Sequence, residues 1–254
     1  MGQSGRPSQL RDAVRRALPQ WNRENLLSSQ ARPLVVQYLY VHGADEDFFY
    51  PTARSSASAA AVAARYLECA LVQAASLSLK GSDCELALAT NVADPSALGR
   101  RGAQLLSRLE ALGVRILPTP YRHRPGDDSA TYVSSRYVLD AILAAADGED
   151  PTRRLVLTDL DCVWLDPEPL FAAIPAPPTI GCLLLGYEAD WDVVGFGDWG
   201  RTRTSIGALA ADLGAPADGL APWVGGELLA GDASAMVELV RACEIGRASC
   251  RERV

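Results

Sequence analysis

The sequence predicts an α/β protein with a Rossmann-type, mainly parallel sheet flanked by helices, followed by a smaller mixed region. Two observations predict this fold class. Short apolar runs of strand character alternate with longer runs of helical periodicity, and three such strand–helix units precede a fourth strand. Consecutive units of this kind imply parallel strands joined by right-handed crossovers. The fourth strand, Arg154 to Thr158, leads directly into two carboxylates, Asp159 and Asp161.

The predicted strands are recognised by their apolar content, which is typical of strands that are buried on both faces. Leu34 to Val41 is the clearest, because it is a continuous apolar and aromatic run apart from one glutamine. The second strand ends at Asn91. The predicted strands are Leu34 to Val41, Cys84 to Thr90, Val114 to Leu117, Arg154 to Thr158 and, in the mixed region, Ile180 to Leu185.

The predicted helices lie between these strands and carry helix signals of different kinds. Ser58 to Leu79 is Ala-rich and long enough for about six turns. Asp94 caps the next helix, with Pro95 at its first position, and Gly113 ends it. Ser129 to Ala146 follows a loop rich in Pro, Arg and Gly, and we expect its apolar side to face the sheet.

We expect the chain to divide into four segments. Residues 1–32 form a polar, basic extension with one weakly amphipathic helix, and residues 33–166 form the α/β half that ends in the acidic pair. Residues 167–243 form the mixed region, in which a further helix begins near Asp232. Residues 244–254 match the translation of a common sequencing-adapter oligonucleotide. We therefore expect an appended tail on a truncated natural sequence that continues beyond residue 243.

Composition and charge exclude several classes of protein. The formal net charge of −7 argues against a basic face for nucleic acid. The six cysteines include no C-x-x-C pair, which argues against a zinc ribbon or a redox dithiol. No apolar stretch approaches the roughly 20 residues of a membrane span, and the N-terminus has no signal-peptide core. We therefore expect a soluble, cytoplasmic protein.

The acidic pair after the fourth strand carries the functional prediction. A desolvated carboxylate beside a buried strand is costly unless a positive charge compensates it. Carboxylate oxygens suit Mg²⁺ or Mn²⁺, and these ions hold the phosphates of substrates. Because open α/β sheets bind ligands at the carboxyl ends of their strands, Asp159 and Asp161 are candidate ligands of a metal that binds a diphosphate.

The segment Leu155 to Pro167, LVLTDLDCVWLDP, resembles the D-x-D signature of GT-A-type glycosyltransferases, which use nucleotide-diphospho-sugar donors. The resemblance covers roughly Pro33 to Cys243. In these enzymes the D-x-D binds a divalent cation, usually Mn²⁺ or Mg²⁺, which bridges the donor diphosphate. The resemblance implies that Asp161 is the principal metal ligand. It also implies that Asp159 contacts the donor ribose or a metal-bound water, with Leu160 between them in the donor site.

Two further positions match places where such enzymes bind the donor, for which we expect a UDP-sugar. Arg136, about one helix before the D-x-D strand, corresponds to a basic residue that reaches the nucleotide sugar, or is simply an exposed helix arginine. Tyr40 ends the first strand, where it either stacks on the base or is a core tyrosine. Many relatives also use a later histidine as a metal ligand. This chain has none after His123, so we expect weak donor binding.

The segment from Trp223 to Glu227 loosely resembles the W-G-G-E element near the acceptor site of several galactosyl- and N-acetylgalactosaminyltransferases, with one residue inserted. The resemblance implies that Trp223, Gly225, Gly226 and Glu227 contact an acceptor. Two glycines would let the backbone approach a sugar closely, and Glu227 could be the general base for an acceptor hydroxyl. The alternative is a strand-edge glycine pair followed by a solvated glutamate.

Other functions fit the same acidic motif. Asp159-x-Asp161-x-Val163 also satisfies the first motif of haloacid-dehalogenase-type phosphatases, in which Asp159 would be the nucleophile and Asp161 the general acid. That motif normally opens the first strand of its domain, and the only lysine here is Lys80. A nucleotidyltransferase is less well supported, because no Gly-rich phosphate loop precedes the first helix. The acidic pair could also cap a loop in a non-catalytic binding domain. Among all these functions we expect the glycosyltransferase, a hexosyltransferase-like enzyme.

Overall fold

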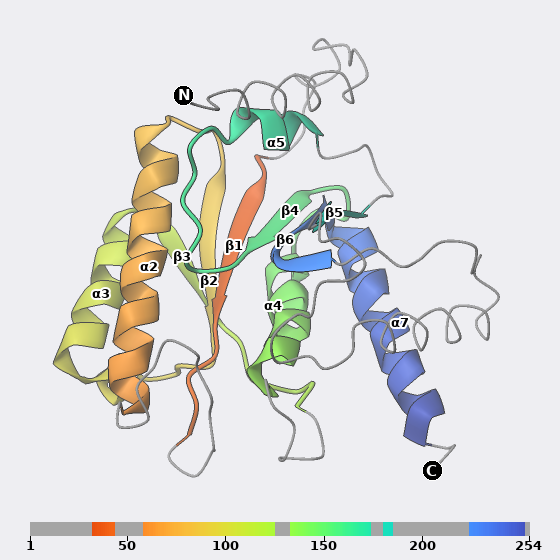
Figure 1. The fold of residues 1–254 in the computed structure, drawn as a ribbon, viewed down its shortest axis with the longest axis horizontal. Coiled ribbons are helices and arrows are strands. Elements are labelled where there is room, and N and C mark those ends of the chain that lie inside the picture. Colours follow the sequence, from red (N-terminus) through yellow and green to blue (C-terminus); the bar gives the residue numbers. More distant parts are fainter. Residues whose placement is uncertain (1–31, 44–57, 125–132, 174–179, 185–223, 252–254) are drawn as a thin grey trace, which may run out of the picture.

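Six strands form a single sheet in the computed structural model, which describes residues 32–43, 58–124, 133–173, 180–184 and 224–251. The strands are β1 (Leu34–Leu39), β2 (Glu85–Thr90), β3 (Val114–Pro118), β4 (Arg154–Thr158), β5 (Ile180–Leu184) and β6 (Val224–Asp232). Their order across the sheet is β3-β2-β1-β4-β6-β5 (Figure 1). The first four are parallel, and β6 runs antiparallel to both β4 and β5.

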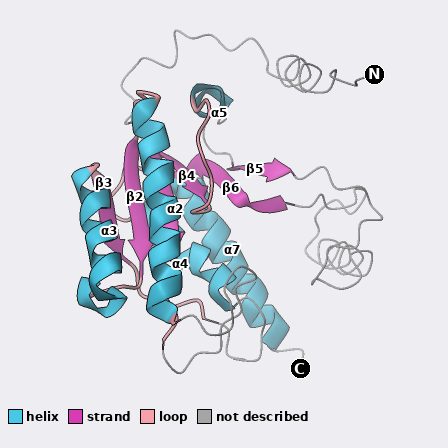
Figure 2. Cartoon of the chain, turned by 60° about the vertical axis from the view of Figure 1, so that its left-hand side comes forward, coloured by secondary structure: helices cyan, strands magenta, loops and turns pink. Residues whose placement is uncertain are grey.

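Helices cover both faces of this sheet. They are α2 (Ala59–Leu79), α3 (Gly99–Ala111), α4 (Tyr137–Ala146), α5 (Glu168–Ala173) and α7 (Ala233–Arg251), with 3₁₀ turns η2 (Pro95–Leu98) and η3 (Val133–Arg136) before α3 and α4. Helices α2 and α3 pack side by side on one face, and α4 and α7 pack together on the other (Figure 2). None of the helices in the described ranges has both the length and the apolar content to cross a membrane.

Strand β1 lies near the centre of the sheet and is buried on both faces, as its apolar run predicts. Leu34 and Val36 enter the core beneath α4 and α7. Leu39 enters the core beneath α2 and α3, and Val35 packs with Leu77 of α2. Side chains alternate between the faces of a strand, so this pattern also places Gln37 on the α2 side and Tyr38 on the α4 side.

The predicted α/β architecture is confirmed, with several element ends shifted. The first strand ends at Leu39 rather than at Val41. Asp94 does act as an N-cap, but it caps the 3₁₀ turn η2, and Gly99, with φ +67°, ends that turn and is the first residue of α3. Of the helix expected from Ser129, residues 129–132 lie outside the described residues, Val133–Arg136 form the 3₁₀ turn η3, and the α-helix begins at Tyr137. The mixed region joins the same sheet, because β6 pairs with β4.

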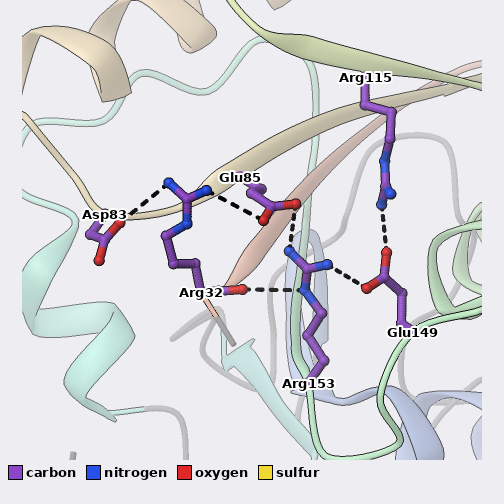
Figure 3. Close-up of polar contacts among 6 residues, drawn as sticks. All are labelled: Arg32, Asp83, Glu85, Arg115, Glu149 and Arg153. Carbon is purple, nitrogen blue, oxygen red and sulfur yellow. Dashed lines mark hydrogen bonds and ion pairs between the residues drawn. The ribbon is translucent and has the colours of Figure 1, made fainter. Parts of the chain in front are cut away.

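The amino-terminal edge of the sheet is held by a network of ion pairs (Figure 3). Arg153, whose side chain is 7% exposed, contacts Glu149 and lies 2.8 Å from a carboxylate oxygen of Glu85. Arg115 of β3 lies 2.7 Å from Glu149, and Arg32 pairs with Glu85 at 3.6 Å. The network therefore joins the starts of β1, β2, β3 and β4, at the edge opposite to the acidic pair.

Candidate functional site

The order of the strands places the acidic pair at a topological switch point. From β1 the chain continues outward to β2 and β3 on one side, whereas β4, β6 and β5 lie on the other side. In open α/β sheets, ligands bind in the crevice outside the carboxyl ends of the strands at such a point. Asp159 and Asp161 follow β4 immediately, so they lie at this place in the fold.

Asp159 is half-buried on the side of the sheet that faces α4. The hydroxyl of Tyr38 donates a hydrogen bond to Oδ1 of Asp159 at 2.9 Å. Tyr38 itself packs against the core beneath α4 and α7. Because one carboxylate oxygen already accepts this bond, the orientation of the Asp159 side chain is set by β1.

Asp161 is exposed and lies on the other side, against α2. It lines a cleft of about 970 Å³ that extends over α2 to the start of α3. Arg65 of α2 and Arg100 and Arg101 of α3 line the same cleft, and Arg101 pairs with Glu68. Within the described ranges, Asp161 forms no ion pair with these guanidinium groups. Its carboxylate is therefore open to a ligand in a cleft that also carries positive charge.

The two carboxylates of the D-x-D thus have different surroundings. In the part of the chain that the structure describes, no group of three or more His, Cys, Asp or Glu side chains could hold a metal ion. Mg²⁺ commonly binds through one or two carboxylates together with substrate phosphates and water, rather than in an all-protein cage. The open carboxylate of Asp161 fits that kind of site, whereas Asp159 lies on the α4 side of the sheet, where Tyr38 donates to it, and is not part of the cleft lining.

The predicted donor residues Leu160 and Tyr40 lie in the core. Leu160 is 7% exposed and packs beneath α2 and α3. Tyr40 is 8% exposed, and its ring packs against the rings of His42, Tyr121 and Tyr137 at centroid distances of 4.9, 4.8 and 5.3 Å. This aromatic cluster matches the core alternative for Tyr40, since other side chains occupy the positions where a base would stack.

Arg136 is exposed at the end of η3, immediately before α4. Helix α4 precedes the parallel strand β4, so its first turn lies at the edge of the sheet where the D-x-D begins. Arg136 therefore lies at the carboxyl edge of the sheet, as predicted. Its contact with the nucleotide-sugar donor remains a prediction.

The predicted acceptor segment also reaches this edge. In the pairing of β6 with β4, Leu228 lies opposite Thr158, so Gly225, Gly226 and Glu227 continue past the carboxyl end of β4. The backbone of this segment therefore lies at the edge where Asp159 begins the D-x-D turn. Trp223 falls outside the described residues.

Several buried polar contacts near this edge were not anticipated from the sequence. The side-chain amide of Asn91 binds both the N–H and the carbonyl oxygen of Val41, each at 2.8 Å, and so fixes the exit of β1. Asp140 of α4 accepts hydrogen bonds from the backbone N–H groups of Arg122 and His123, and its Oδ1 lies 2.8 Å from Nδ1 of His123. In the sequence, the only local sign of these contacts was that Asn91 follows the end of a predicted strand.

A scan against protein-family models and a search of curated proteins found no match to this chain.

Proposed function

We propose that this chain is a metal-dependent glycosyltransferase of the GT-A type, which moves a sugar from a nucleotide-diphospho-sugar, foremost a UDP-sugar, to an acceptor. One observation supports this function above others. The D-x-D turn directly follows β4, and the Gly225–Glu227 backbone, far away in sequence, continues β6 past the carboxyl end of β4, beside the switch point between β1 and β4. A donor site and an acceptor site must adjoin for a sugar to pass between them.

Asp161 is the residue proposed to hold Mn²⁺ or Mg²⁺, because its carboxylate is exposed to a cleft of nucleotide size. When bound, the ion neutralises the charge that builds on the departing nucleoside diphosphate. Asp159, oriented by Tyr38, is proposed to contact the donor ribose or a water on the ion. Arg65 and Arg100 line the same cleft and add positive charge for a diphosphate.

Glu227 is proposed as the general base that removes the proton from an acceptor hydroxyl. This role depends on the position of its backbone beside the D-x-D turn. Gly225 and Gly226 carry no side chain that would keep an acceptor sugar away from this edge.

The test is a calorimetric titration of UDP into the chain, run once with Mn²⁺ and once with EDTA. Roughly 5–10 mM Mn²⁺ should saturate a weak metal site. We expect binding that requires the metal, with the weak affinity anticipated from the absence of a later histidine. Binding that is equal in EDTA, or no binding up to millimolar UDP, would contradict the proposal.

The phosphatase alternative is tested in parallel with p-nitrophenyl phosphate. A phosphatase that uses Asp159 as nucleophile should release p-nitrophenol, and Asp159→Asn should abolish the release. The proposed transferase should instead hydrolyse a UDP-sugar slowly in the absence of acceptor. Phosphatase activity without UDP-sugar hydrolysis would favour the alternative.

A further inference from the structure

A buried polar cluster lies directly beneath the D-x-D turn, on the α2 side of the sheet. It consists of Gln37 of β1, Gln73 of α2 and Thr158 of β4, whose exposed fractions are 4%, 0% and 1%. Helix α2 is otherwise Ala-rich on its buried side. Buried polar groups that make their hydrogen bonds define one arrangement of the surrounding backbone. Within the described residues Oε1 of Gln37 makes no such bond, whereas both ends of the Gln73 amide do.

Gln73 connects this cluster to the D-x-D turn. Its Nε2 lies 3.0 Å from the carbonyl oxygen of Asp159 and 3.0 Å from Oγ1 of Thr158. Its Oε1 accepts a hydrogen bond from the Gln37 amide. Both ends of the Gln73 amide are therefore used, and one of its donors holds the first residue of the motif.

Ser76, one turn further along α2, holds the other end of the same segment. The backbone N–H of Trp164 donates a hydrogen bond to Oγ of Ser76 at 3.0 Å, and this hydroxyl donates to the carbonyl of Gln73 at 2.7 Å. Between these two attachments Leu160 is buried beneath α2, whereas Asp161 is exposed to the cleft. Helix α2 thus binds the segment 159–164 at both ends.

We infer that Gln73 and Ser76 are positioning residues, which fix the segment 159–164 on α2 so that the Asp161 carboxylate projects into the cleft. The inference rests on the proposed function for the metal-binding role of Asp161. A ligand residue held in its binding orientation before the metal arrives avoids the cost of ordering the loop on binding. Loss of either attachment should therefore loosen the loop and weaken metal-dependent nucleotide binding together.

The first experiment measures the loop itself by amide hydrogen exchange of residues 160–164, without any ligand. Ser76→Ala should speed exchange of these amides by about tenfold or more. Ser78→Ala is the matched control, because Oγ of Ser78 bonds only within α2, to the carbonyl of Ala74 at 3.0 Å. Ser76→Thr retains the hydroxyl and should restore protection. Equal exchange in Ser76→Ala and Ser78→Ala would overturn the inference.

The second experiment measures the Mn²⁺-dependent affinity for UDP in four variants. Ser76→Ala and Gln73→Met should each weaken the affinity by about fivefold to tenfold. Ser78→Ala and Gln104→Met should leave it unchanged, because Oγ of Ser78 bonds only within α2 and Gln104 lies at an exposed position of α3. If Gln73→Met fails to fold, Ser76→Ala still tests the positioning role.

The failures of the two proposals are distinguishable. Absence of metal-dependent UDP binding in the wild-type chain overturns the proposed function, whatever the exchange rates are. Wild-type binding combined with equal affinities in Ser76→Ala and Ser78→Ala overturns the positioning role, even if the loop of Ser76→Ala exchanges faster.

Discussion

Tyr38 of β1 donates its hydroxyl hydrogen to Oδ1 of Asp159, 2.9 Å away, across the strand pair at which the sheet order reverses. Asp161, two residues further on, is instead exposed on the α2 side. The two carboxylates of one motif therefore have different environments, one hydrogen-bonded and half-buried, the other open to a cleft. Different environments favour different chemical roles for two groups of the same type.

Tyr38→Phe should remove the hydroxyl hydrogen bond to Asp159 while leaving the packing of the ring intact. We expect the free energy of unfolding to fall by about 1 kcal/mol, because one hydrogen bond to a carboxylate is lost. Metal-dependent UDP affinity should also fall. Tyr137→Phe is the control, since it removes a hydroxyl that is 2.7 Å from the carbonyl of Thr119 and far in sequence from the motif. Equal UDP affinity in the two variants would contradict this role for Tyr38.

Asp161→Asn should remove metal-dependent UDP binding, because the amide keeps the shape of the carboxylate but lacks its charge. A loss of at least tenfold in affinity, or about 1.4 kcal/mol, is expected by calorimetry. Asp147→Asn makes the same change in net charge at an exposed position after α4, and it should leave the affinity unchanged. If Asp161→Asn binds like the wild-type chain, Asp161 does not hold the metal.

Glu149→Gln should make the protein less stable at pH 7 but not in acid. Burial by itself would raise the pKa of Glu149, but hydrogen bonds from Arg115 and Arg153 outweigh burial and lower that pKa. A carboxyl whose pKa is lowered by folding contributes stability above its unfolded pKa, and the contribution disappears as the pH falls through the folded pKa. We expect a difference of about 1–3 kcal/mol in the free energy of unfolding at pH 7.

Urea unfolding of the wild-type chain and Glu149→Gln over a pH series checks this prediction. The difference between them should shrink below about pH 4, near the ordinary range for glutamate. Glu110→Gln, at an exposed position of α3, should show no difference at any pH. A difference that grows in acid would mean that the sign of the pKa change at Glu149 is wrong.

Cys84 should resist alkylation at pH 8, although it is not fully buried. Burial and the neighbouring Asp83 carboxylate raise the pKa of its thiol to about 11. Roughly 0.1% of this thiol is therefore thiolate at pH 8, and the thiolate is the reactive form. Iodoacetamide labelling followed by peptide mapping should find the exposed Cys243 modified well before Cys84. Comparable rates for both cysteines would contradict the prediction.

Local patterns were sufficient for the fold class and for the place of the acidic pair along the chain. The apolar run at β1 and the Ala-rich run at α2 reflect burial within single elements, which periodicity and composition encode directly. The position of Asp159 and Asp161 after a parallel strand follows from the repeated strand–helix units. The predicted ends of the elements were less accurate, because the capping of η2 and the positive φ of Gly99 determine where the turn stops and the helix starts.

The partners of the motif depend instead on the order and register of the strands. Tyr38 and Asp159 are 121 residues apart in the chain, and Gln73 and Asp159 are 86 apart. Pairing of β4 with β1 and with β6 is what brings Tyr38 and the backbone of Gly225–Glu227 to the D-x-D turn. Such contacts arise from packing between elements, which the periodicity of any single element does not encode. The sequence therefore revealed the acidic motif, whereas the assembled sheet and α2 determine how each carboxylate is presented.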